Sequence, residues 1–307
     1  MERGVYWRIA EKSMEADAQE RSIEYLTEHL SRFLRKGERV LICFLEHKEG
    51  DLSWLMEQAV LRSGAIPVVW GPDRRWKTLL RLAFSNKVSA IIGPPLVVLG
   101  LTKLKKANGT PLYVRKVITA GYPCPDWMIE GIVKGLDCEM GGCFSLGESG
   151  AVAGFACGHS WGVHIREAEY GVDIVDAEGN SLPEGELGEI VLYPKACPEL
   201  RYPMGENARL KYTPCRCGSK APRLLDMRPG RTEDPDLMVL GQQLQSWTSI
   251  LDCRLNKGEY GLEIEIVTFP GEKLPKLPSA AKLVVRPWDP DTDEPFWYVP
   301  TLRIAEN

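Results

Sequence analysis

Residues 38–70 read ERVLICFLEHKEGDLSWLMEQAVLRSGAIPVVW, and two short apolar runs in this stretch enclose a longer amphipathic segment. The apolar runs at Arg39–Leu45 and Ile66–Trp70 have the length of buried strands. Between them, Leu52–Leu61 has the apolar spacing of a helix and is followed by Gly64, a residue type that often ends helices. Two strands joined by a helix of this length predict a parallel crossover unit.

The same alternation continues on both sides of this unit. A helix is predicted over residues 12–35, because apolar side chains recur there at three- and four-residue steps. Further helices are predicted at Trp76–Phe84, Pro95–Lys105 and Trp127–Lys134, and further strands at Ala90–Ile92 and Val114–Thr119. After about residue 137 strands predominate, and they are predicted at Ala151–Ala156, Tyr170–Val175, Glu189–Tyr193, Leu237–Leu240, Gly261–Thr268 and Lys282–Val285.

These patterns predict an α/β fold, in which a parallel sheet with flanking helices is followed by a β-rich portion and a small α+β C-terminal remnant. The expected limits are residues 1–136 for the α/β sheet layer, 137–231 for the β-rich portion and 232–307 for the reduced C-terminal domain. A chain of 307 residues is long enough for one large or two modest domains with a proper core.

The composition and net charge of the chain limit the kinds of partner that it is expected to bind. The net charge is −4 and the charged fraction is 26%, so no basic field would attract nucleic acid or an anionic membrane. No apolar run approaches the roughly 18 residues of a membrane span, and the first residues, Met1–Gly4, lead into charged sequence without the apolar core of a signal peptide. We therefore expect a cytoplasmic protein that binds neither nucleic acid nor membrane.

Nine cysteines are an odd number in a chain without an export signal. In a reducing compartment cysteines act as core residues, metal ligands or nucleophiles rather than as disulfides. Cys43 lies in the apolar run Val40–Phe44 and is predicted to be an inert core residue.

Four other residues have the chemistry of a metal site. Cys215 and Cys217 form a C-x-C pair in a predicted turn, so both thiolates can face one ion. Upstream, Cys157 and His164 are separated by six residues, which is enough for a hairpin to return a second pair. Three sulfurs and one imidazole make a closed tetrahedral Zn²⁺ site with a structural role, in which His159 could replace His164. The alternative is that the upstream pair are ordinary strand residues and the C-x-C pair is a coincidence.

Several motifs in a fixed order carry a resemblance to a known family. They are FSLGESG at residues 144–150, GELGEIV at 185–191, LRYPMGENARL at 200–210, PCRCG at 214–218 and PGRTED at 229–234. In this order and spacing the chain resembles the phenylacetate-CoA ligases and coenzyme F390 synthetases, a branch of the AMP-forming acyl-CoA ligases, over about residues 20–241. Members of this branch carry cysteines and a histidine at the positions of the four proposed ligands, which favours zinc.

The resemblance implies a two-step reaction and a set of binding residues. A carboxylate substrate attacks the α-phosphate of ATP, which gives an acyl-adenylate and pyrophosphate, and a thiol such as CoA then displaces AMP. Glu148 is the implied catalytic residue, holding Mg²⁺ or a phosphate-side contact. Nucleotide contacts are implied for the adenine-lining Ala120, Gly121, Tyr122 and Pro123, for Ser145 and Gly147 in the motif before Glu148, for Glu206 at the ribose, and for Arg231 near the hinge to the C-terminal domain.

The chain also departs from the family pattern. Residues 1–35 contain one glycine, Gly4, and no Ser/Thr/Gly-rich phosphate loop, whose backbone N–H groups would bind phosphates. Gly147 stands where the family has threonine or serine, Glu206 stands where it has aspartate, and residues 242–307 contain no recognisable catalytic-lysine motif. We therefore expect the isolated chain not to adenylate simple acids at ordinary enzymatic rates.

Two other functions remain open at this stage. One is a non-catalytic relative that binds a nucleotide, a CoA-type ligand or a protein, and the other is one subunit of a split enzyme whose partner protein supplies the phosphate loop. The individual residues also have simpler explanations. Glu148 could be a solvated turn carboxylate, Gly121 a turn residue, Arg231 a surface arginine, and Glu206 the ion-pair partner of Arg201 or Arg209.

Overall fold

The computed structural model describes residues 16–44, 46–145, 152–158, 162–229, 235–270, 272, 274, 276, 279–280 and 282–296. In its first part, strands alternate with helices, and every neighbouring strand pair is parallel. The elements are α2 (Ala16–Phe33), β1 (Arg39–Ile42), α3 (Leu52–Arg62), β2 (Ile66–Val69), α4 (Trp76–Ser85), β3 (Ala90–Gly93), α5 (Pro95–Asn108), β4 (Lys116–Thr119), α6 (Asp126–Leu136) and β5 (Glu139–Ser145).

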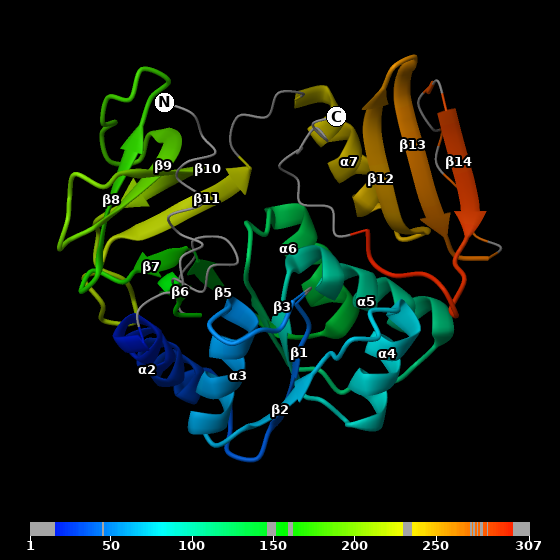
Figure 1. Ribbon diagram of the computed structural model, residues 1–307, viewed down its shortest axis with the longest axis horizontal. Coiled ribbons are helices and arrows are strands. Elements are labelled where there is room, and N and C mark those ends of the chain that lie inside the picture. Colours follow the sequence, from blue (N-terminus) through cyan, green and yellow to red (C-terminus); the bar gives the residue numbers. More distant parts are fainter. Residues whose placement is uncertain are drawn as a thin grey trace.

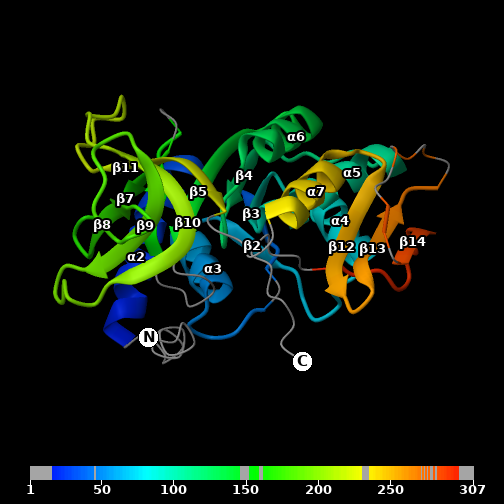
Figure 2. The ribbon, with the colours of Figure 1, turned by 90° about the horizontal axis from the view of Figure 1, so that it is seen from above.

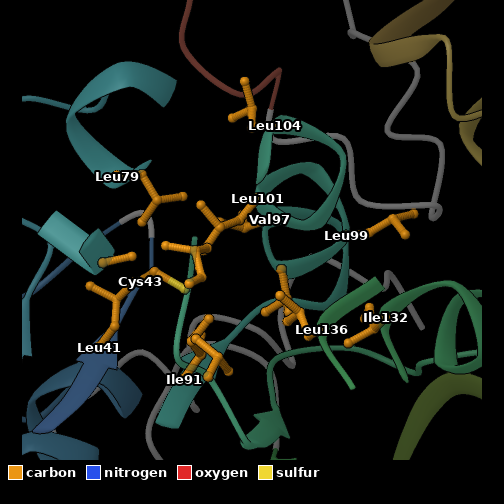
Figure 3. Close-up of a cluster of buried hydrophobic side chains, with 14 of the residues drawn as sticks. Leu41, Cys43, Leu79, Ile91, Val97, Leu99, Leu101, Leu104, Ile132 and Leu136 are labelled. Carbon is orange, nitrogen blue, oxygen red and sulfur yellow. The ribbon is translucent and has the colours of Figure 1, made fainter. Parts of the chain in front are cut away.

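Helices cover both faces of these parallel strands. Helices α2 and α3 lie on one face, and α4, α5 and α6 lie on the other (Figure 1). Successive strand residues point to opposite faces, so Val40 and Ile42 enter the core under α2 and α3, while Leu41 and Cys43 enter the core under α4 to α6. Figure 3 shows Leu41 and Cys43 among leucine and valine side chains from α4 and α5. Burial raises the pKa of the Cys43 thiol to about 12, as expected for an inert core cysteine.

The β-rich portion extends the same sheet with antiparallel strands. The elements are β6 (Val152–Ala156), β7 (Val163–Ile165), β8 (Tyr170–Val175), β9 (Leu187–Pro194), β10 (Tyr202–Lys211) and β11 (Arg223–Pro229). Strand β5 pairs in parallel with β4 and antiparallel with β6, which joins both halves into one eleven-stranded sheet of order β2-β1-β3-β4-β5-β6-β7-β11-β10-β9-β8. A third apolar cluster lies inside the antiparallel half.

The C-terminal part has a separate three-stranded sheet. It contains α7 (Pro235–Ser246), β12 (Ile250–Gly258), β13 (Gly261–Thr268) and β14 (Lys282–Pro287), with strand order β12-β13-β14. Seen from above in Figure 2, α7 lies between α6 and β12. The predicted α/β fold class, with a parallel sheet followed by β-rich structure and a small α+β part, is confirmed.

One predicted element is wrong. Leu237–Leu240 was predicted as a strand because four apolar residues follow one another, but these residues lie in helix α7. Leu237, Leu240 and Leu244 recur at helical spacing and pack against β12 and β13, whereas Val239 is exposed. A short apolar run does not distinguish a strand from a buried helix segment when its continuation is ignored. Among the helices that the structure describes, none combines the length and apolarity that crossing a bilayer requires.

We expect Gly100→Ala in helix α5 to destabilise the protein. A Cβ atom at Gly100 would lie 2.2 Å from the Trp76 ring, whose side chain is fully buried. Glycine to alanine usually stabilises a helix interior by about 0.5–1 kcal/mol, but overpacking here should cost about 1–3 kcal/mol. Urea unfolding measures the difference, and Gly131→Ala in α6, whose Cβ would meet only the end of the Leu99 side chain, should cost less. A stabilised Gly100→Ala protein would contradict this packing.

Candidate functional site

Two hairpins bring the cysteines and the histidine together. The first hairpin joins β6 to β7 and contains Cys157 and His164, and the second joins β10 to β11 and carries Cys215 and Cys217 in its turn. Strands β7 and β11 pair with each other, so that His164 lies opposite Arg223. Residues about 60 positions apart in the chain therefore meet because of one strand pairing.

The ligand atoms of the four residues form a tight cluster. Cys157 Sγ lies 3.5 Å from Cys215 Sγ, and Cys217 Sγ lies 3.5 Å from His164 Nε2. All four ligand atoms lie within 4.8 Å of one another. In a tetrahedral site with Zn–S bonds of about 2.3 Å, sulfur atoms are separated by about 3.8 Å. The cluster thus has the donor types and the dimensions of a Cys/His metal site.

The second hairpin and its surroundings orient the ligands. The Cys215 N–H donates to the Ser219 carbonyl and the Gly218 N–H donates to the Cys215 carbonyl, both at 3.0 Å, which closes the predicted turn. His164 is buried, and its Nδ1–H donates to the Ala221 carbonyl at 3.3 Å. This bond fixes the tautomer that leaves the Nε2 lone pair facing the sulfurs. Any residue type can supply a carbonyl, so the sequence contained no signal for the role of Ala221.

A second group of predicted residues lies where the parallel strands end. Ala120–Pro123 follow β4, and Ser145 ends β5, which runs parallel to β4 at the same edge of the sheet. In open α/β sheets, ligands bind outside the carboxyl ends of the strands. Gly121 has a φ of 99°, in the region that favours glycine, and a Cβ there would meet no atom of the described residues within 4 Å.

Tyr122 has a structural contact of its own. The Leu96 N–H, in the first turn of α5, donates to the Tyr122 hydroxyl at 3.0 Å. Burial raises the pKa of this hydroxyl, so it stays protonated at neutral pH. The side chain therefore ties the loop after β4 to the start of α5, and the adenine-lining role of Tyr122 stays a prediction.

Glu206 on β10 is the most unusual ionisable residue of the antiparallel half. The residue is partly exposed, but its Oε2 atom is buried and has no hydrogen-bond partner among the described residues. Loss of solvation raises the pKa of the Glu206 carboxyl to about 8. A buried carboxyl oxygen without a partner among the described residues is costly, which makes this position a candidate for contact with a polar ligand.

The simpler explanation for Glu206, an ion pair with a neighbouring arginine, is wrong. Arg201 pairs with Asp173, and Arg209 pairs with Asp226 at 2.9 Å. Along β10 the side chains alternate, so Glu206 shares its side of the strand with the buried Ala208 and not with Arg209. Arg209 additionally donates to the Gly185 carbonyl. Both arginines are engaged elsewhere.

The remaining predicted site residues, Gly147, Glu148, Arg231 and the alternative ligand His159, lie outside the described residues. Their roles stay predictions.

Comparisons with known proteins identify the fold. No protein-family model and no curated protein matches the chain. Among solved structures, 2-hydroxyisobutyryl-CoA ligase in the postadenylation state with R3-HIB-AMP is similar, with a TM-score of 0.65 and 13% identity over 95% of this chain and 70% of that one. The same ligase with 2-HIB-AMP and CoA has a TM-score of 0.59, with 15% identity over 83% of this chain and 58% of that one.

A third similar structure is the anthranilate CoA ligase AuaEII with anthranoyl-AMP, which has a TM-score of 0.54 and 14% identity over 83% of this chain and 54% of that one. The protein has the fold of the adenylate-forming acid–CoA ligases. It spans between 54% and 70% of the length of these three neighbours. At these identities the comparison shows the fold alone.

The buried Glu206 carboxyl predicts a specific pH dependence of stability. Its pKa is about 8 in the folded protein, against 4.5 as its ordinary value. Between these two pH values folding takes up a proton, so the free energy of unfolding falls as pH rises, by up to about 1.4 kcal/mol per pH unit. Glu206→Gln should remove this decline, whereas Glu186→Gln, at an exposed turn, should keep it. Urea unfolding from pH 5 to 8 tests this, and identical slopes for wild type and Glu206→Gln would contradict it.

Proposed function

We propose that the protein binds an adenylate, either AMP or an acyl-AMP, at the carboxyl edge of its parallel strands. The observation that carries this proposal is the buried Oε2 of Glu206, which has no partner among the residues that the structure describes, in a chain with the fold of acid–CoA ligases. A ribose offers two neighbouring hydroxyl donors, and a carboxylate is the side chain best suited to accept both. The ligand would thus supply the hydrogen bonds that the described residues do not.

The loop after β4 supports the same proposal. Gly121 leaves its backbone open at the end of β4, where a planar base could approach without meeting a side chain. Ser145 lies at the end of the neighbouring strand β5. Gly121 follows β4, Ser145 ends β5, and Glu206 belongs to β10 of the same eleven-stranded sheet, which supports the proposal.

The proposal has two forms, which differ in whether a chemical reaction follows adenylate binding. As an enzyme, the protein would join a carboxylic acid to the α-phosphate of ATP with release of pyrophosphate, and a thiol of the CoA type would then accept the acyl group. As a binding protein, it would hold the adenylate without turnover. Pyrophosphate release that requires a carboxylic acid identifies the first form, and adenylate affinity without release identifies the second.

We expect AMP binding to release a proton. Contact with ribose hydroxyls favours the charged form of Glu206, whose pKa in the free protein is about 8, so at pH 7 the carboxyl must lose its proton on binding. Calorimetry in two buffers of different ionisation enthalpy measures this proton. Glu206→Gln should abolish the release and weaken AMP by about 10- to 100-fold, whereas Glu186→Gln should do neither.

A 2′,3′-dideoxy analogue of AMP provides the matched ligand control. It should bind wild type about as weakly as AMP binds the Glu206→Gln variant. Equal affinity of wild type for AMP and the dideoxy analogue would contradict a ribose contact, and no affinity for AMP or an acyl-AMP analogue would end the proposal.

We further propose that Cys157, His164, Cys215 and Cys217 hold one structural Zn²⁺. The support is the donor set of three sulfurs and one imidazole, with all ligand atoms within 4.8 Å. Four protein ligands leave no open position for water, so the ion would join the two hairpins and take no part in catalysis. The ion would also keep the three thiols deprotonated.

Removal of one of the four ligands should lower both the zinc content and the thermal stability of the protein. Cys215→Ser should lower the zinc content from about one ion per chain. It should also reduce the melting temperature by roughly 10 °C, since each kcal/mol shifts a chain of this size by about 2–4 °C. His164→Ala should do the same and His159→Ala should not, and Cys197→Ser, at a cysteine whose thiol contacts Glu199, is the control. Metal analysis and thermal unfolding give the answer, and metal-free, fully folded wild type from zinc-replete cells would refute the site.

A further inference from the structure

The cluster of three cysteines and one histidine would carry a net charge when it holds zinc. Three thiolates and one neutral imidazole around a divalent ion leave the site with one net negative charge. His164 and Cys215 are buried, each with 6% of its surface exposed. A charge removed from water in this way is costly unless a cation lies beside it. The zinc affinity of the site therefore depends on the charges around the four ligands.

A buried arginine lies next to the cluster. Arg223 is 7% exposed, and it begins β11 directly opposite His164 of β7. Side chains that face each other across an antiparallel strand pair lie on the same side of the sheet, so the Arg223 and His164 side chains are neighbours. The Arg223 Nη2 group also donates to the carbonyl of Thr213 at 3.3 Å, two residues before Cys215. Arg223 thus joins the strand of the histidine ligand to the start of the turn that carries the C-x-C pair.

Other cations of the second hairpin are exposed to solvent. Lys211 lies opposite Arg223 on β10, Arg216 lies between the two cysteines of the turn, and Lys220 follows them; all three are exposed. Water and salt screen such charges strongly, whereas a buried guanidinium stays protonated and acts in a medium of lower dielectric constant. Lys211 and Arg223 would also repel each other across the strand pair, and a negative cluster beside Arg223 reduces this cost.

We propose that Arg223 is a positioning residue of the metal site, whose charge balances the negative charge of the zinc-loaded cluster and whose bond to Thr213 fixes the start of the C-x-C turn. This role rests on the proposed zinc site and adds a residue that sets its affinity. Arg223 does not bind the ion, since four other residues supply the ligand atoms. Residues that support metal ligands in this way commonly change metal affinity by about 10- to 100-fold.

Competition with a chelator tests the role of the charge in the zinc-loaded full chain. Arg223→Gln keeps a hydrogen-bond donor but removes the charge, so half of the zinc should be lost at a chelator concentration about 10- to 100-fold lower than in wild type. Arg223→Lys keeps the charge and should retain most of the affinity. Arg216→Gln, at the exposed arginine between the two cysteines, should behave as wild type. Zinc retention by Arg223→Gln equal to that of wild type would overturn the proposed role.

A change in the ligand set separates the charge of Arg223 from the shape of its side chain. In Cys217→His, two thiolates and two imidazoles around a divalent ion make a neutral site, and Cys217 is the exposed ligand, so an imidazole can replace its thiol. Arg223→Gln should therefore cost little zinc affinity in the Cys217→His background. An equal loss of affinity in both backgrounds would show that Arg223 does not act through its charge, which contradicts the proposed role.

The same titrations distinguish the role of Arg223 from the zinc site itself. Wild type that holds no zinc would end both proposals, whereas wild type that holds zinc no more tightly than Arg223→Gln would end only the role of Arg223. If Arg223→Gln does not fold, Arg223→Lys decides the matter. Zinc held by Arg223→Lys at the chelator concentrations that wild type tolerates supports the role of the charge, and loss of zinc at lower concentrations overturns it.

Discussion

Strand β5 imposes the constraint on which the molecule depends, because it pairs in parallel on one side and antiparallel on the other. Gly142 lies opposite Thr119 of β4, and Cys143 lies opposite Phe155 of β6. The strand also changes cores, since Cys143 is buried under α2 and α3 whereas Phe144 is buried in the antiparallel half. This one strand makes the parallel layer and the β-rich portion a single sheet.

Local periodicity predicted the helices α2 to α6 and the strands β1 to β4 of the parallel layer, whereas β5, with the sequence EMGGCFS, was not predicted. Periodicity gave no prediction or a wrong one where the apolar pattern is weak or resembles that of another element. Strand β10 carries Arg209 and Lys211 and few apolar residues, so the same stretch was recognised from its motif and not as a strand. The apolar run at Leu237–Leu240 suggested a strand, although the burial of Leu244 one turn further on shows a helical face.

Spacing also predicted which residues could bind a metal, but not that they meet. The encounter of Cys157 and His164 with Cys215 and Cys217 depends on the pairing of β7 with β11, a contact between segments that are distant in sequence. Only the register that sets His164 opposite Arg223 brings the imidazole to the turn of the second hairpin. A shift of one residue would turn His164 to the other face of the sheet.

Two acidic side chains with buried oxygen atoms, Asp252 and Glu206, differ in how those oxygens are hydrogen-bonded. Asp252 accepts hydrogen bonds from two backbone N–H groups and from the Gln245 amide, and all three donors belong to the C-terminal part. Glu206 is partly exposed as a residue, but its Oε2 atom is buried and the described residues provide no donor to it. Among the described residues, both oxygens of Asp252 therefore accept hydrogen bonds, whereas the Oε2 atom of Glu206 accepts none. A buried polar atom of this kind is costly unless a ligand supplies the missing hydrogen bond, which is why Glu206 is central to the proposal of adenylate binding.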